Sequence, residues 1–142
     1  MHLIIQGITA EPQRVHNLKF IYELLDSYPA QIGMHKVSPP QVSQYQIPNT
    51  HQPIVSGFVL LAESHISIHF FPRRSYLNID VFSCKEFEPQ KVLQDLKQRF
   101  RLKEVKTYLL ERPPSTLSLP EGGFANAPHS RRFCESASCS RG

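Results

Sequence analysis

The order of apolar and polar residues divides the first 112 positions of the chain into short strands and two amphipathic helices. Apolar and polar side chains alternate over 65–71 and 76–83, which is typical of half-buried strands. Apolar side chains recur at helical spacing over 15–28, where Pro29 is expected to end the helix, and over 89–100. The pattern predicts strands at 3–8, 33–37, 54–62, 65–71, 76–83 and 103–110.

This order of elements predicts an α+β fold, a two-layer αβ sandwich in which the helices cover one face of an antiparallel sheet. The sequence Pro-Arg-Arg at 72–74 is expected to form the turn between two strands. The polar stretch 38–53 is punctuated by prolines and is predicted to be a loop with a short extended piece at 42–47. That loop is interpreted either as a plain connector or as a lid over a substrate.

The composition changes at Pro113. Pro, Ser, Gly, Ala and Arg dominate 113–142, and the spacing of hydrophobic residues is lost there. Such a segment buries too little apolar surface to offset the entropy of ordering it. The sequence therefore predicts one domain at 1–112, followed by a disordered tail at 113–142.

Charge and composition argue against several classes of protein. The net charge of +4 contains no block of like charge, and Arg73-Arg74 is the only adjacent basic pair in 1–112, which argues against nucleic-acid binding. No apolar run approaches the roughly 18 residues of a membrane span, and the N-terminus lacks the features of a signal peptide. The three cysteines, an odd number without a disulfide-type spacing, indicate a reducing compartment, so a cytoplasmic location is expected.

One predicted strand carries candidate chemistry on one of its two faces. Side chains alternate along it, so the apolar ones face the helices, whereas His65, Ser67 and His69 share the other face, beside Ser64. Cys84 ends the next strand, and the hairpin is expected to bring it back beside Ser64. Such a face is the solvated side of a sheet, a zinc site made of His65, His69 and Cys84, or a reactive site.

Two motifs in this region resemble a known family. The segment Ser-Gly-Phe-Val-Leu-Leu-Ala-Glu-Ser-His-Ile-Ser-Ile-His at 56–69 closely resembles the processing site of the prokaryotic S-adenosylmethionine decarboxylases. The segment Asp-Val-Phe-Ser-Cys at 80–84 resembles the second motif of the same family at the matching distance. The resemblance covers roughly 1–112 and excludes the tail.

The resemblance implies a self-processing enzyme. The hydroxyl of Ser64 attacks the carbonyl of Glu63, the chain is cut between these residues, and Ser64 becomes a pyruvoyl group that forms a Schiff base with the substrate. His69 is implied as the processing base, assisted by Ser56, and Cys84 as the proton donor after loss of carbon dioxide. The expected cofactor is this pyruvoyl group, with no metal.

The resemblance also implies a small-molecule substrate, S-adenosylmethionine, whose product supplies spermidine synthesis, and a homodimer with sites at the interface. Phe71, Arg73 and His65 are expected to contact the substrate. The family usually continues Thr-Trp-Pro-Glu after the processing histidine, so Phe71 keeps the aromatic surface while Arg73 replaces a glutamate that grips the ribose. The alternatives are a pyruvoyl-dependent arginine or ornithine decarboxylase on the same scaffold and a non-catalytic partner subunit.

Overall fold

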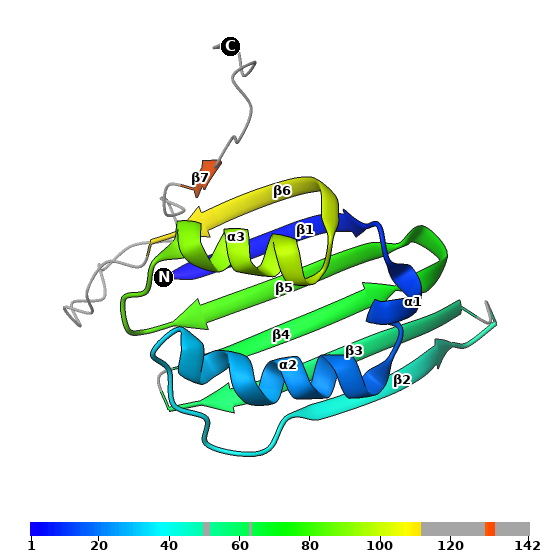
Figure 1. Cartoon of the computed structure of the whole chain (residues 1–142), viewed down its shortest axis with the longest axis horizontal. Helices are drawn as coiled ribbons and strands as arrows, with labels where there is room; N and C mark the ends of the chain where they lie inside the picture. The colour runs from blue at the N-terminus through cyan, green and yellow to red at the C-terminus, as the bar shows by residue number, and fades with distance from the viewer. Residues whose placement is uncertain (50–51, 63, 112–129, 133–142) are drawn as a thin grey trace, which may run out of the picture.

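The computed structural model describes residues 1–49, 52–62 and 64–111, and the backbone of 130–132. These ranges form one antiparallel sheet with two longer helices and one short one (Figure 1). A 3-10 turn between the fourth and fifth strands, η1, confirms the predicted turn. The elements in chain order are β1 (His2–Thr9), α1 (Pro12–Val15), α2 (Leu18–Gln31), β2 (Gln41–Ile47), β3 (Gln52–Leu61), β4 (Ser64–Phe71), η1 (Pro72–Arg74), β5 (Tyr76–Ser83), α3 (Pro89–Arg99), β6 (Leu102–Leu110) and β7 (Ser130–Arg132).

The strands lie in the order β2-β3-β4-β5-β1-β6-β7, and every neighbouring pair is antiparallel. Helices α2 and α3 lie on the same face of the sheet, α2 over the β2–β3 side and α3 over the β1–β6 side (Figure 1). The predicted two-layer αβ sandwich is therefore confirmed. We call the face away from α2 and α3 the open face.

The core lies between the helices and the sheet, because alternate residues of each central strand point there. In β4 the residues that face the helices, Ile66, Ile68 and Phe70, are almost fully buried. They continue across the sheet into rows of apolar side chains from β3, β5 and β1, so burial of this face supplies much of the hydrophobic stabilisation. Each helix completes the core with one apolar stripe, formed by Ile21, Leu24, Leu25, Tyr28, Val92, Leu93 and Leu96.

Helix α2 approaches the sheet most closely at Gly57 of β3. A Cβ atom at Gly57 would lie 2.7 Å from Ile21 Cγ2 and 2.7 Å from Leu25 Cδ1. Real Cβ atoms do not approach other atoms this closely, so only glycine allows the helix to pack at this distance.

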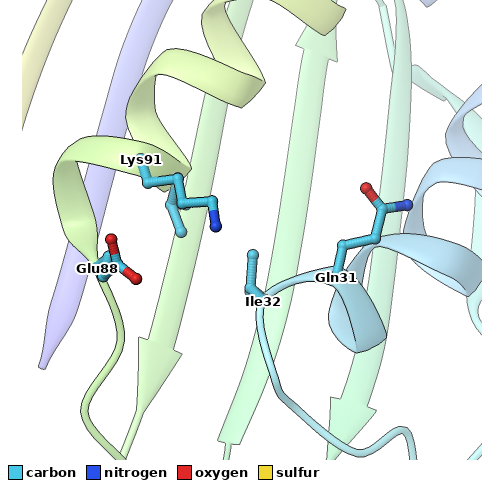
Figure 2. A pocket seen from close by; sticks show the side chains of 5 residues that line it. Gln31, Ile32, Glu88 and Lys91 are labelled. Carbon is cyan, nitrogen blue, oxygen red and sulfur yellow. The ribbon is translucent and has the colours of Figure 1, made fainter.

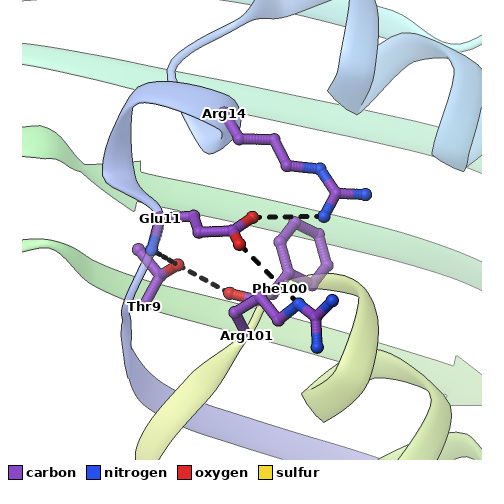
Figure 3. A network of polar contacts seen from close by, with 5 residues as sticks. All are labelled: Thr9, Glu11, Arg14, Phe100 and Arg101. Carbon is purple, nitrogen blue, oxygen red and sulfur yellow. Dashed lines mark hydrogen bonds and ion pairs between the residues drawn. The ribbon is translucent and has the colours of Figure 1, made fainter.

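A polar network joins the corner after β1 to the end of α3 (Figure 3). The hydroxyl of Thr9 donates to the carbonyl of Phe100 at 2.6 Å and accepts from the backbone N–H of Glu11 at 3.0 Å. The Glu11 carboxylate lies between two guanidiniums, 3.3 Å from Arg14 and 3.7 Å from Arg101. The network holds the end of α3 against the first crossover of the chain.

The first helical segment differs from the prediction at both ends. The helix predicted over 15–28 is two helices, because Asn17 caps α2 by accepting the backbone N–H of Lys19 at 2.9 Å. Pro29 does not end α2, which continues to Gln31. Proline removes only one hydrogen bond of a helix, and the carbonyl of Pro29 still accepts the N–H of Met34 at 2.9 Å.

The segment after α2 also differs from the prediction. Residues 33–37 do not form a strand: Gly33 turns the chain at φ +74°, and only Lys36 makes a bridge, with Leu61. The interpretation of 38–53 as a loop or a substrate lid is wrong, but the short extended piece predicted at 42–47 is confirmed. Gln41–Ile47 is the edge strand β2, paired with β3 along its length, and its hydrophobic alternation is weak because the edge strand is largely exposed.

The tail lies mostly outside the described residues. The prediction of disorder over 113–142 therefore stays a prediction for 113–129 and 133–142. The backbone of Ser130–Arg132 pairs with Tyr108–Leu110 of β6 as β7.

Candidate active site

The polar residues of the central strands line up in rows on the open face. Cross-strand partners in an antiparallel sheet point to the same side, so the register shows which residues are neighbours. The predicted division of β4 is confirmed: His65, Ser67 and His69 face away from the helices. From β3 through β4 and β5 to β1, three rows of the open face are Leu60–His65–Phe82–His2, Phe58–Ser67–Asp80–Ile4 and Ser56–His69–Asn78–Gln6.

Ser64 lies at one end of the sheet, where β4 begins. It pairs with Leu61 of β3 and with the buried Ser83 of β5. The Oγ atom of Ser64 is buried and has no hydrogen-bond partner among the described residues. Cys84 follows Ser83 directly and is exposed, so the hairpin brings the thiol to the end of β4 as predicted. Glu63, the other side of the expected cleavage point, lies outside the described residues.

Ser56 and His69 form a second polar group, in the middle of the open face. They are cross-strand partners on β3 and β4, and Ser56 Oγ lies 2.9 Å from His69 Nδ1. The hydrogen bond fixes one nitrogen of the imidazole in a strand-to-strand contact. The expected base and its expected assistant are therefore in contact.

The two groups are far apart within one chain. His69 is five residues beyond Ser64 on the same strand, and a strand rises about 3.4 Å per residue, which gives a separation of about 17 Å. A single chain therefore does not bring Ser64 and the expected base, His69, together. The register places Cys84 directly after the cross-strand partner of Ser64, and Ser56 contacts His69, but the two pairs lie at different points along β4.

His65 lies at the Ser64 end, inside an aromatic row. Its ring centroid is 5.7 Å from that of Phe58 and 5.2 Å from that of Phe82. His2 extends the row, with its centroid 5.7 Å from Phe82 and its Nε2 2.8 Å from Asp80 Oδ1. This aromatic row lies on the open face at the Ser64 end of β4, where it can contact an apolar or aromatic group of a ligand.

Phe71 and Arg73 lie at the opposite end of β4. Phe71 is seven residues from Ser64, about 24 Å along the strand. Together they line a cavity of about 210 Å³. The other residues that line it are Ile47, Gln52, Pro53 and Arg74. Of the three predicted substrate contacts, only His65 is near Ser64 of the same chain.

A second pocket, of about 90 Å³, lies between the end of α2 and the start of α3 (Figure 2). Gln31 and Ile32 line one side, and Glu88, Lys91 and Val92 line the other. These residues belong to the helix layer, and none of them is a predicted site residue. The pocket is therefore separate from the chemistry of the open face.

The zinc interpretation is not supported. His65 and His69 are four residues apart on one strand, about 14 Å, whereas zinc ligands lie about 2.0–2.3 Å from the ion. Across the described ranges, no three His, Cys, Asp or Glu side chains gather closely enough to hold a metal ion. Nor is any helix in those ranges long and apolar enough to cross a membrane.

Several neighbours of His69 and His65 were not among the predicted site residues. Asn78 and Gln6 share the row of His69, and Phe58 and Phe82 flank His65. The alternation of 76–83 was visible in the sequence and assigns Asn78 and Phe82 to the open face. The missing information was the register that sets each beside its neighbour.

Comparison with known proteins identifies the family of the chain. The family described as S-adenosylmethionine decarboxylase matches residues 1–113. The chain is 28% identical over 105 residues to the S-adenosylmethionine decarboxylase proenzyme of Clostridium botulinum (strain Hall), covering 73% of this chain and 85% of the relative. It is 29% identical over 103 residues to that of Thermococcus gammatolerans, covering 72% and 68%.

A solved structure shares the fold. The crystal structure of the adenosylmethionine decarboxylase from Aquifex aeolicus VF5 superposes with a TM-score of 0.53 at 23% identity. The match covers 75% of this chain and 83% of that one. The sheet with helices on one face is therefore the architecture of that protein too.

Proposed function

Because the chain belongs to the S-adenosylmethionine decarboxylase family, we propose that it cuts itself between Glu63 and Ser64 and removes carbon dioxide from S-adenosylmethionine. One observation carries the proposal: the Ser64 hydroxyl is buried without a partner among the described residues, and the exposed Cys84 follows its cross-strand neighbour. A buried hydroxyl without a partner is costly, and such groups are often reactive. The product of this reaction is the aminopropyl donor for spermidine synthesis.

The proposed processing uses Ser64 as its own nucleophile. Its Oγ attacks the carbonyl carbon of Glu63, the peptide nitrogen takes up a proton, and an ester replaces the amide. Removal of the Cα proton of residue 64 then breaks the ester. The main-chain carboxylate of Glu63 leaves, and residue 64 becomes dehydroalanine. Water hydrolyses this to pyruvoyl with loss of ammonia. Each step moves a proton, so the imidazole of His69, held by Ser56, is the proposed base.

The pyruvoyl group, once formed, supplies a carbonyl that draws electrons from the breaking bond to the substrate carboxylate. The chain supplies the rest. Cys84 donates the proton that replaces carbon dioxide, and its exposed position at the end of β5 leaves the thiol open to a ligand. The aromatic row of His65 offers ring contacts at that end of the open face for part of the substrate.

The 17 Å between Ser64 and His69 supports a site shared by two chains. The open face exposes apolar side chains, with Phe58 41% and Leu60 44% accessible. Exposed apolar patches of this kind mark interaction surfaces. Two open faces packed about a two-fold axis near Ser67 would run the β4 strands in opposite directions. Each His69 would then lie over the Ser64 end of its partner, so the proposed assembly is a homodimer with two shared sites.

The same pairing would bring the cavity beside Phe71 and Arg73 toward the Ser64 of the partner. The two guanidiniums that line it, Arg73 and Arg74, disfavour the cationic side chains of arginine and ornithine. An adenosyl group carries no charge at its far end, and its nitrogens and hydroxyl oxygens accept hydrogen bonds from arginine. The charge at the cavity therefore supports S-adenosylmethionine over the alternative substrates.

Denaturing mass spectrometry of the purified protein tests the processing. We expect two fragments, the larger beginning with a pyruvoyl group at position 64, and an intact chain for Ser64→Ala. Carbon dioxide release is then measured in parallel with S-adenosylmethionine, arginine and ornithine. Decarboxylation by Ser64→Ala would refute the pyruvoyl mechanism, and preference for arginine or ornithine would refute the substrate.

Sedimentation analysis tests the assembly with a matched pair of variants. Phe58 on the open face and Tyr22 on α2 are both 41% accessible. Phe58→Glu should convert the dimer to a monomer and stop processing, because each Ser64 loses the His69 of its partner. Tyr22→Glu should remain a dimer that cleaves itself. A Phe58→Glu monomer that still cleaves at the normal rate would contradict the shared site.

A further inference from the structure

The row that contains His69 has a neighbour on each side of the imidazole. Ser56 of β3 is hydrogen-bonded to Nδ1 at 2.9 Å, and Asn78 of β5 is the cross-strand partner on the other side. Gln6 of β1 follows Asn78 in the same row. The imidazole of His69 is therefore held at Nδ1, and its neighbour on β5 is the carboxamide of Asn78.

Asn78 has an unusual feature for a residue of a polar sheet face. Its Oδ1 atom is buried and accepts no hydrogen bond within the described residues. A buried acceptor without a donor costs free energy of folding. Leucine or valine at this position would avoid that cost, so the carboxamide has a use that stability does not explain.

We propose that Asn78 is a positioning residue for His69, whose Oδ1 accepts the Nε2–H of the imidazole during self-processing. Directly opposite residues hold their Cβ atoms about 4.5–5.5 Å apart, so rotation of the two side chains brings a carboxamide oxygen within hydrogen-bond distance of an imidazole nitrogen. With the proton of the neutral ring held on Nε2, the basic nitrogen is Nδ1, which faces the Ser56 hydroxyl.

This contact assigns a direction to proton transfer. The proton removed from the reacting chain passes to Ser56 Oγ as the Ser56 proton passes to Nδ1, and the resulting imidazolium is stabilised by the Asn78 oxygen. A ring held at both nitrogens also keeps its plane, whereas a ring held only by Ser56 is free to turn. The inference rests on the proposed function, because it gives His69 the role of processing base.

Other polar groups around His69 do not replace Asn78. Ser67 precedes it by two residues on β4, and Tyr76 and Asp80 are diagonal neighbours on β5. The Asp80 carboxylate already binds His2 Nε2 at 2.8 Å. Asn78 is therefore the acceptor directly opposite the imidazole.

The test follows cleavage of the full chain in a cell-free translation reaction, as a function of pH, by denaturing mass spectrometry. Asn78→Leu keeps the volume and removes the acceptor, and should slow cleavage about tenfold or more. Asn78→Asp restores the acceptor. It should cleave within about threefold of wild type, with its pH profile moved to higher pH because a carboxylate favours the imidazolium. Gln94→Ala, an exposed carboxamide on α3, is the control and should cleave normally.

Each outcome decides the proposal. Normal cleavage by Asn78→Leu, or equal slowing of both variants without a pH shift, would overturn it. A variant that cleaves normally but has a raised KM for carbon dioxide release makes Asn78 a substrate contact and also overturns it. Asn78→Asp gives a second measurement if the leucine variant does not fold. A wild-type chain that stays whole overturns the proposed function itself, whereas cleavage of wild type beside an unimpaired leucine variant overturns this inference alone.

Discussion

The two faces of the sheet differ in what they are made of and in what they do. The helix-covered face consists of apolar rows whose members are almost fully buried, such as Val59, Ile66 and Val81. The open face carries serine, histidine, asparagine and aromatic side chains. Both are encoded by the same strands, since alternate residues of β4 go to opposite sides. Adjacent positions such as Ile68 and His69 should therefore affect different properties, stability for one and chemistry for the other.

The largest effect is expected at His69. His69→Ala should slow self-cleavage by about 10²–10⁴-fold, because a positioned base is lost. Its free energy of unfolding should change by less than about 0.5 kcal/mol, as for other exposed positions. Fragment formation after translation and urea unfolding measure the two properties. A large loss of stability would mean that the open face also holds the fold together.

A mixed dimer sharpens this prediction. A chain with Ser64→Ala keeps its His69, and a chain with His69→Ala keeps its Ser64. Coexpression should allow the His69→Ala chain to cleave, using the imidazole of its partner. Failure of the mixture to cleave would contradict a site shared between two chains.

At Cys84 we expect normal processing and poor turnover. Cys84→Ala should form two fragments at the normal rate, while kcat for carbon dioxide release falls about 10²-fold or more because the proton donor is missing. The exposed position of the thiol predicts little change in stability. Equal loss of processing and turnover would show that Cys84 belongs to the cleavage step instead.

Ile68→Ala is the counterpart on the helix-covered face. Removal of this fully buried side chain should lower the free energy of unfolding by about 2–5 kcal/mol through lost burial and a cavity. Cleavage at a temperature where the variant is folded should stay near the wild-type rate. Urea unfolding of the uncleaved Ser64→Ala background gives the stability without interference from processing.

Gly57→Ala should cost about 1–3 kcal/mol. The new methyl group would overlap Ile21 and Leu25, so α2 must move away from β3. Ser56 precedes Gly57 on the strand, but its side chain is on the other face. Thermal unfolding should therefore change more than the rate of cleavage, and the reverse result would mean that the two faces are mechanically coupled.

The smallest effect is expected at Tyr28, in the core. Burial raises the pKa of its hydroxyl well above the usual 10.0, with the Asp95 carboxylate adding to the shift and Arg99 opposing it. The neutral form is favoured in the fold, so its stability contribution is complete below pH 10 and is lost as pH rises above that value. Tyr28→Phe should change stability at pH 7 by less than about 1 kcal/mol and reduce the loss at pH 11. Urea unfolding at both pH values measures this.

The sequence predicted most of the fold where one face of a strand is buried and the other is polar. β4 and β5 were placed to within one residue for that reason. β2 was predicted only as a short extended piece at 42–47 and not as a strand of the sheet, because an edge strand is exposed on both sides and Gln41–Ile47 lacks the period of two. The prediction that Pro29 ends the helix was wrong, because the loss of one N–H donor does not stop a helix whose apolar face is packed.

The sequence named candidate site residues, and these stay predictions, but it did not predict the distances between them. Ser64 and His69 are close in sequence, and an extended strand places them about 17 Å apart. Contacts such as Ser56 with His69 depend on a cross-strand register that a single sequence does not contain. Because His69 is too far from Ser64 of the same chain, the proposed site is shared between two chains.

The strand order has a further consequence for the cleaved protein. Residues before position 64 contribute β1, β2 and β3, and the residues that follow contribute β4, β5 and β6. In the sheet β4 and β5 lie between β3 and β1, and β1 lies between β5 and β6. Once cut, the fragments remain interleaved, and neither can leave without breaking several ladders of hydrogen bonds. Refolding then requires two separate polypeptides to meet, so recovery after denaturation should depend on concentration for the cleaved protein but much less for the Ser64→Ala chain. The proposed cleavage would thus turn refolding from a reaction of one chain into a reaction between two.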